Sequence, residues 1–332
     1  MNAIDPIQAA RWDAARELHH RYFIGLILFV LQKHGTDAAA EMMKRTFERQ
    51  RGQKFLQSIE KLGLAGLPPA ETAAKFLYLA NKLGGVLVEC AVESPEKAWI
   101  RYPTPRWMYD GTAICAIPPE VSTAPMRGFH SQIGATLGVE SLGYVCVGQT
   151  AEGHPGLEGF FIDRGRPLAP HERLSFEPDH PRPDYDPAQF PTVDWPEDRL
   201  LKVKRNYAVT YLTNALPALI EVLGARDAGE AGHGAGVRIG LHYYGKLRDI
   251  MGESGDFGDF LLALLSGMDE AAGREDAHTV AQTGWRTMRG REDQFDPLLR
   301  AWSGLIEGCL LVHDRTRRFR VERDGERIVW RF

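Results

Sequence analysis

The sequence predicts an α+β protein with a helix-rich internal duplication, in which each half packs helices on a small antiparallel sheet ending in a β-hairpin. Long stretches with apolar residues at helical spacing are followed by pairs of short apolar runs that flank turn residues. The order of these elements also repeats. Residues 20–30 resemble 204–214, and residues 75–85 resemble 259–269, each at an offset of 184.

Glycines and prolines mark the elements of the first half, residues 1–164. Gly35 and the pair Gly84-Gly85 are expected to end helices, because glycine readily adopts the backbone conformation found at a helix C-terminus. The helices are expected at 8–34, 37–62, 70–83 and 125–138. Strand pairs are expected at 86–102, around a Ser-Pro turn, and at 143–162, with an irregular stretch at 103–120 between them.

Residues 165–197 contain eight prolines, so they are expected to form an extended connector that carries no helix and no central strand. The second half, residues 198–332, then repeats the order of elements. Its expected elements are helices at 199–223, 235–251 and 296–312, an apolar stretch at 256–271, a strand at 277–285 and a hairpin at 317–332. The glycine-rich GHGAG at 232–236 is interpreted as a loop or a helix start.

One face of the helix expected at 199–223 is unusually polar. It carries Lys204, Tyr207, Tyr211 and Asn214, within an arc of roughly 80° at about 100° per residue. The equivalent face of the first half carries His20, Phe23, Ile27 and Val30. Unpaired polar groups are costly to bury, so this face is interpreted as the border of a binding pocket. Two alternatives remain: ordinary core tyrosines with solvated tips, or a subunit interface that would make the protein a homodimer.

Other polar and aromatic residues are candidates for the same pocket. His130 opens a helix of the first half and is a candidate acid or base. Rigid aromatic rings beside arginine and aspartate suit the binding of a small molecule. The candidates for substrate binding are therefore Asn214, Arg101, Tyr102, Arg106, Trp107, Tyr109, Asp110, Tyr244, Trp285 and Arg286. The alternative is that these residues pack a surface loop or face solvent.

Composition and missing motifs exclude several classes of function. The net charge of −4 offers no general attraction to nucleic acid or to an anionic membrane surface. The four cysteines have no metal-site spacing, and no nucleotide-binding, serine-hydrolase or zinc-protease motif is found, so neither metal nor cofactor is expected. The N-terminus lacks a signal-peptide pattern and the longest apolar run, 23–31, is too short to span a membrane, so we expect a cytoplasmic protein.

Residues 86–162 resemble the L-2-amino-thiazoline-4-carboxylic acid hydrolase-like family and, more distantly, ligand-binding domains of the 4-vinyl-reductase type. The similar stretches are VECAVESPEKAWIRYPTPRW, AICA and GYVCVGQTAEGHPGLEGFFI. The resemblance implies a small domain with a ligand cavity, with a ring-opening or bond-cleaving activity. Two cysteines expected from that family are replaced, near Pro103 or Pro105 and near Gly159 or Phe160.

These observations together predict a cofactor-independent lyase or hydrolase that cleaves a small aromatic, phenolic or heterocyclic compound, as an enzyme of aromatic catabolism would. Tyr207, Tyr211, Lys204 and His130 would supply general acid–base catalysis, for instance in a retro-aldol cleavage that releases an aldehyde. The arginines would anchor a carboxylate or phenolate. The alternative, from another class, is a sensor or carrier that binds a small molecule without converting it.

Overall fold

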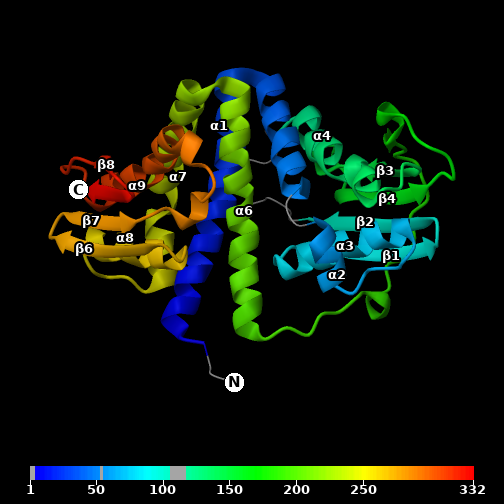
Figure 1. Ribbon diagram of the computed structural model, residues 1–332, viewed down its shortest axis with the longest axis horizontal. Helices are drawn as coiled ribbons and strands as arrows, with labels where there is room; N and C mark the ends of the chain where they lie inside the picture. The colour runs from blue at the N-terminus through cyan, green and yellow to red at the C-terminus, as the bar shows by residue number, and fades with distance from the viewer. Residues whose placement is uncertain (1–3, 53–54, 105–116) are drawn as a thin grey trace. The chain divides into compact units, whose positions relative to one another are not determined.

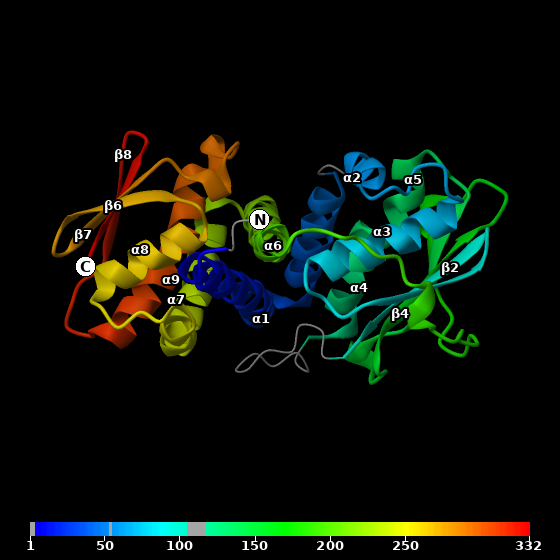
Figure 2. The same ribbon diagram turned by 90° about the horizontal axis from the view of Figure 1, so that it is seen from below.

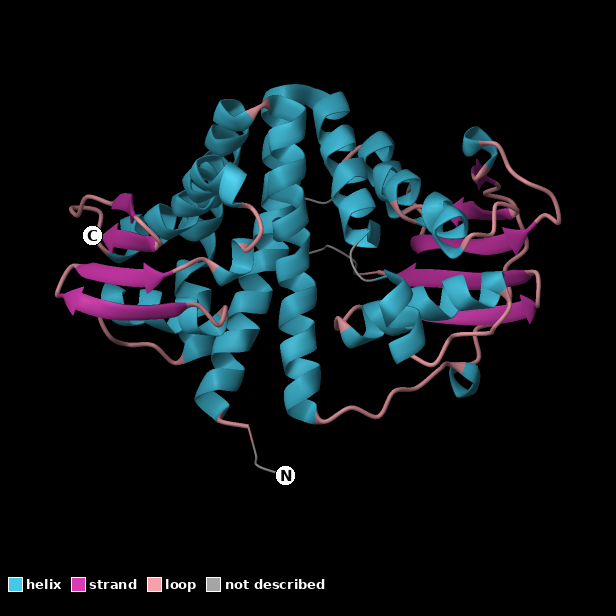
Figure 3. Ribbon diagram, viewed as in Figure 1, coloured by secondary structure: helices cyan, strands magenta, loops and turns pink. Residues whose placement is uncertain are grey.

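The computed structural model describes residues 4–52, 55–104 and 117–332, and the chain divides into two compact units. Unit 1 comprises Met1–Ala38 and Pro196–Phe332, and unit 2 comprises Ala39–Trp195. Helices predominate, and each unit holds a small sheet (Figure 3). The predicted α+β class is therefore confirmed. The grouping differs from the division anticipated at the connector, because residues 1–38 belong with the second half of the chain.

Helix α1 (Pro6–Gly52) contains the predicted break at Gly35, whose φ of 86° and ψ of 175° are not helical (Figure 1). The two helices expected at 8–34 and 37–62 are thus joined through this one residue. The second of them ends at Gly52, and the short helix α2 (Phe55–Lys61) occupies the rest of that range. Helix α3 (Pro69–Leu83) agrees with its prediction and is followed by Gly84-Gly85, with Gly85 at φ 81°.

The sheet of unit 2 has the strand order β1-β2-β4-β3-β5. Its strands are β1 (Glu89–Ser94), β2 (Lys97–Pro103), β3 (Leu142–Gly148), β4 (Gly156–Asp163) and β5 (Leu174–Phe176). The first four pair antiparallel, as predicted, and β5 runs parallel to β3. Helices α3 and α4 (Pro119–Gly128) lie on one face of this sheet, with α5 (Ile133–Leu137) nearby (Figure 2).

Helix α4 begins inside the stretch that was expected to be irregular, because Pro119 occupies its first turn, where proline is well tolerated. The proline-rich connector follows its prediction more closely, because its strand, β5, is short and lies at the sheet edge. The connector also covers the second face of the sheet. There Tyr185 packs against Trp99, Val145, Val147 and Phe160.

Unit 1 contains helices α6 (Glu197–Leu223), α7 (Ala225–Met251), α8 (Phe257–Gly267) and α9 (Phe295–His313). Its sheet has the order β6-β7-β9-β8, with β6 (Ala271–Asp276), β7 (Thr279–Thr283), β8 (Arg320–Asp324) and β9 (Arg327–Arg331), all antiparallel. Helices α8 and α9 lie on one face of it (Figure 2). Strand β6 was not predicted, because it is almost entirely exposed and shows no apolar alternation.

The expectation that GHGAG forms a loop or helix start is wrong, because residues 232–236 lie in the middle of α7. Two glycines of this stretch, Gly232 and Gly236, join Gly240 of α7 and Gly304 and Gly308 of α9 in allowing the two helices to pack backbone against backbone. A Cβ at Gly308 would lie 2.2 Å from the carbonyl oxygen of Val237, and one at Gly304 would lie 2.2 Å from that of His233. On α7, a Cβ at Gly240 would lie 2.4 Å from the Leu305 carbonyl oxygen. We call these contacts the glycine seam. Glycine is unfavourable inside a helix, and the close approach of the two backbones explains why it occurs at these positions.

Candidate functional site

The polar face predicted from the sequence brings two tyrosine hydroxyls together on α6. The hydroxyl oxygens of Tyr207 and Tyr211 are 2.9 Å apart, a hydrogen bond in which either can donate. Their rings meet edge to face, with centroids 5.3 Å apart. Tyr211 is buried and Tyr207 is half-buried. We call these two residues the tyrosine pair.

Helix α1 supplies the neighbours of the tyrosine pair within unit 1. Phe23 stacks on Tyr211 with centroids 4.6 Å apart, and the His20 ring lies 6.0 Å from the Tyr211 ring. Burial, with a smaller contribution from nearby charges such as Arg16, lowers the pKa of His20 to about 3. His20 is therefore a neutral imidazole at physiological pH. The sequence pointed to it only as the counterpart of Lys204 in the other half.

The other two residues of the face lie above and below the tyrosine pair on α6. Asn214 is fully buried, and its amide nitrogen donates to the carbonyl oxygen of Thr210 at 2.8 Å. Lys204 is half-buried, one turn before Tyr207. The side chains on this face thus become more buried from Lys204 to Asn214.

A hydrogen-bonded pair of phenols has a defined chemistry. When one hydroxyl donates to the other, the accepting hydroxyl can donate its own proton in turn, so the pair can relay a proton. The phenolate left after that transfer is stabilised by the hydrogen bond from its neighbour. A neutral imidazole and a stacked phenylalanine ring lie beside the pair.

His130 and Tyr102 meet in a different place, the core of unit 2. The His130 ring lies 4.7 Å from the Tyr144 ring and is parallel, within 5°, to Phe161 at 6.2 Å. The Tyr102 ring approaches it edge-on at 6.4 Å. The Tyr102 hydroxyl accepts from the side-chain amide of Asn81 at 3.3 Å, a partner that the sequence did not single out. His130 is only 5% exposed, so its surroundings are those of a core histidine.

The remaining described candidates make contacts within the protein at separate places. Arg101 pairs with Glu89 and lies over the Tyr185 ring at 4.1 Å. The Tyr244 hydroxyl is 2.5 Å from Nδ1 of His313, and burial raises the pKa of Tyr244. Trp285 packs edge-on against Phe295. The candidates that lie outside the described residues are Arg106, Trp107, Tyr109 and Asp110.

Arg286 belongs to a charged cluster that the sequence did not reveal. Its guanidinium and that of Arg205 reach the same oxygen, Oδ2 of Asp269, at 2.9 Å and 2.8 Å, and Lys202 lies 3.9 Å away. Partial burial acts to raise the pKa of Asp269, but hydrogen bonds from Arg205 and Trp12 hold it below its ordinary value. Asp269 also has a φ of 56°, a left-handed conformation that aspartate tolerates. The cluster ties α6 to the turn between α8 and β6.

Three further observations limit the chemistry. Burial raises the pKa of Cys90 and of Cys146 to about 12, and also raises that of Cys309, so these thiols are poor nucleophiles. In the described part of the chain, no cluster of three or more histidine, cysteine, aspartate or glutamate side chains could hold a metal ion. Across the same residues, no helix is both long and apolar enough to cross a membrane.

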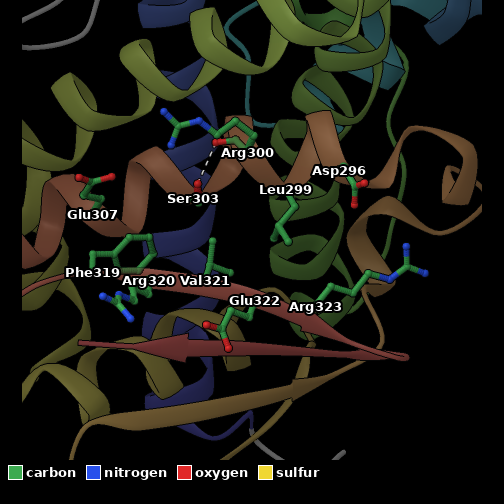
Figure 4. Close-up of a pocket in the computed structure, with 10 residues that line it drawn as sticks. All are labelled: Asp296, Leu299, Arg300, Ser303, Glu307, Phe319, Arg320, Val321, Glu322 and Arg323. Carbon is green, nitrogen blue, oxygen red and sulfur yellow. Dashed lines mark hydrogen bonds between the residues drawn. The ribbon is translucent and has the colours of Figure 1, made fainter.

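A cavity of about 510 Å³ in unit 1 lies between α9 and β8 and contains none of the predicted site residues (Figure 4). Comparison of the chain with protein-family models, with curated proteins and with solved structures finds no match. The function proposed below is therefore inferred from the geometry of the side chains.

Proposed function

We propose that this protein is a cofactor-independent lyase or hydrolase that cleaves a bond in a small aromatic, phenolic or heterocyclic compound. The tyrosine pair is its acid–base group: one hydroxyl transfers a proton to the departing oxygen or carbon, and the other stabilises the phenolate that remains. The observation that carries the proposal is the 2.9 Å hydrogen bond between the two hydroxyls.

The neighbours of the pair hold the Tyr211 ring in place. Phe23 is buried and stacks on that ring, and neutral His20 lies beside it. Lys204 is the cation on this face and would attract an anionic oxygen on the ligand. The proposal leaves His130 in a structural role, because its ring is enclosed by aromatic side chains in unit 2.

A screen for binding followed by a search for turnover tests this function. The purified chain would be tested by thermal shift against aromatic acids, lignin-type phenolics, thiazolines and hydantoins, with mass spectrometry on each hit. A ligand at a hundred times its dissociation constant stabilises the folded state by about 2.7 kcal/mol. Tyr207→Phe and Tyr211→Phe should each lower turnover at least about a hundredfold, the range for loss of one general acid.

The matched control is Tyr185→Phe, which also removes one phenolic hydrogen bond, 2.8 Å to Glu158, but in unit 2. It should retain turnover. If the two pair variants turn over like the control, the acid–base assignment is wrong.

A second candidate function is binding without chemistry, as in a sensor or carrier. It is favoured by the burial of Tyr211, which is 2% exposed and stacked on Phe23. A hit in the thermal-shift screen with no change of ligand mass would support this function over the enzyme.

We also propose that the two units arose by internal duplication. We further propose that the protein is located in the cytoplasm. The sheets have equivalent orders, β1-β2-β4-β3 and β6-β7-β9-β8, and each follows the sequence helix, hairpin, helix, hairpin. Free buried cysteines favour a reducing compartment. The resemblance of residues 86–162 to the thiazoline-carboxylate hydrolase-like family agrees with a ligand-binding ancestor.

A further inference from the structure

Strand β8 ends the sheet of unit 1 and borders a groove. Within the described chain it pairs with β9 on one side only. Four of its five residues are exposed, and the fifth, Val321, is half-buried. The groove of about 510 Å³ lies between β8 and α9, with Leu299, Phe319 and Val321 among its lining residues (Figure 4). The backbone edge and the apolar lining are therefore accessible from the same side.

Unit 2 shows what an added strand looks like at the equivalent edge. Strand β3 has the place in its sheet that β8 has in unit 1, and the connector strand β5 pairs with it. The Tyr144 amide donates to the Arg173 carbonyl at 2.9 Å, and the Glu177 amide donates to the Cys146 carbonyl at 2.9 Å. The same strand arrangement thus accepts one more strand in unit 2, whereas β8 has none among the described residues.

The charge at this edge indicates what kind of strand would bind. Residues 315–324 contain five arginines, one glutamate and one aspartate, Asp324. That glutamate, Glu322, already pairs with Arg331. In the described residues no carboxylate forms an ion pair with Arg320 or Arg323, and the Arg323 guanidinium lies over the Phe295 ring. The β8 side of the groove is therefore positive.

The other charges around the groove are mostly paired. Arg300 pairs with Glu230, and the Glu307 carboxylate lies 2.8 Å from Nε2 of His233, within hydrogen-bond distance. Asp296 lies in the first turn of α9, where the helix dipole favours a negative charge. Among the lining residues of the groove in the described chain, Arg320, Arg323 and Asp296 thus form no ion pair.

We propose that β8 accepts an extended acidic segment of a partner protein as a fifth strand of the unit 1 sheet. Backbone hydrogen bonds to the open edge would supply affinity, and apolar side chains at alternate positions would cover Leu299, Phe319 and Val321. Carboxylates at the intervening positions would reach Arg320, whereas Arg323 lies on the Val321 side of the strand. The same arginines repel a second copy of β8, so the edge admits an acidic strand and resists self-pairing.

The test uses the full chain and a fluorescein-labelled heptapeptide of alternating glutamate and valine. Fluorescence anisotropy would measure its binding, and amide hydrogen exchange would report where it binds. We expect saturable binding together with slowed exchange at residues 319–324. Arg320→Glu should weaken binding about tenfold or more, because a contact with the peptide carboxylates becomes a repulsion. Arg289→Glu is the matched control, since it reverses the charge of another exposed arginine in the same unit outside the groove.

Four outcomes would overturn the proposal. The first is equal binding of a lysine–valine heptapeptide, and the second is binding without slowed exchange at β8. The third is an equal effect of Arg320→Glu and Arg289→Glu in variants with unchanged circular dichroism. The fourth is self-association in sedimentation that protects β8 without peptide, which would assign the edge to a second copy.

Discussion

Placing one methyl group in the glycine seam should destabilise unit 1 measurably. In Gly308→Ala the new Cβ would lie 2.2 Å from the Val237 carbonyl oxygen, whereas ordinary contact begins near 3.4 Å. The oxygen belongs to the backbone of α7 and cannot rotate away, so the two helices must separate by about 1 Å, which weakens dispersion contacts along the seam. Such overpacking typically costs about 1–3 kcal/mol.

The intrinsic preference of a helix for alanine acts in the opposite direction. Replacing glycine by alanine inside a helix gains about 1 kcal/mol. Gly245 isolates this gain, because it lies in α7, is exposed and has nothing within 4 Å of its Cβ position. We therefore expect Gly245→Ala to stabilise the protein and Gly308→Ala to lie about 1–3 kcal/mol below it, which is the overpacking cost alone because the helix gain is common to both variants.

Urea unfolding followed by circular dichroism, with calorimetry for the melting temperature, would measure the difference. A change of 1 kcal/mol corresponds to about 2–4 °C for a domain of 150–250 residues. If Gly308→Ala and Gly245→Ala are equally stable, the backbones of α7 and α9 are not in contact at this seam and the reasoning fails.

Three more predictions follow from buried groups. Burial lowers the pKa of His19 to about 4 and that of His20 to about 3. Below pH 6.5 the unfolded chain therefore binds protons that the folded chain does not. The free energy of unfolding should decrease by about 1.4 kcal/mol per pH unit for each histidine, until the pH reaches those values. Urea titrations at several pH values would show this, and His20→Phe should flatten the dependence. Arg205→Met should cost about 1.5–3 kcal/mol, because it removes the hydrogen bonds of a buried guanidinium to Asp269 and to the Gly267 carbonyl, while Arg286 still pairs with Asp269; an unfolding free energy within about 0.5 kcal/mol of wild type would contradict this. Native protein should leave three thiols unmodified by Ellman's reagent until urea is added, those of Cys90, Cys146 and Cys309.

Local signals in the sequence were reliable where a single residue type decides the backbone. Gly35 interrupts α1, Gly224 follows α6, and the Asp324-Gly325 pair turns the last hairpin, with Gly325 at φ 60°. The prolines of the connector also limited it to an edge strand and short turns. These features depend on the conformational freedom of one or two residues, which does not change with the surroundings.

Only part of the candidate site could be predicted from the sequence. Helical spacing placed Tyr207 and Tyr211 one turn apart, but spacing cannot specify the hydrogen bond between them, which depends on side-chain rotamers. It also could not show that His20 and Phe23 lie beside them, since these residues are remote in the chain. Nor could the sequence show that Arg286 pairs with Asp269 or that the Tyr244 hydroxyl lies beside His313.

By itself the sequence determined the α+β class, most helix boundaries, both terminal hairpins and the polar face of α6, because each follows from local conformational preference and periodicity. Only the tertiary structure decided that GHGAG is helical, that β6 forms an exposed edge, and which polar side chains pair with one another. The glycines of α7 and the small and charged residues of β6 are poor formers of their elements, so they are held there by the surfaces they meet in the fold.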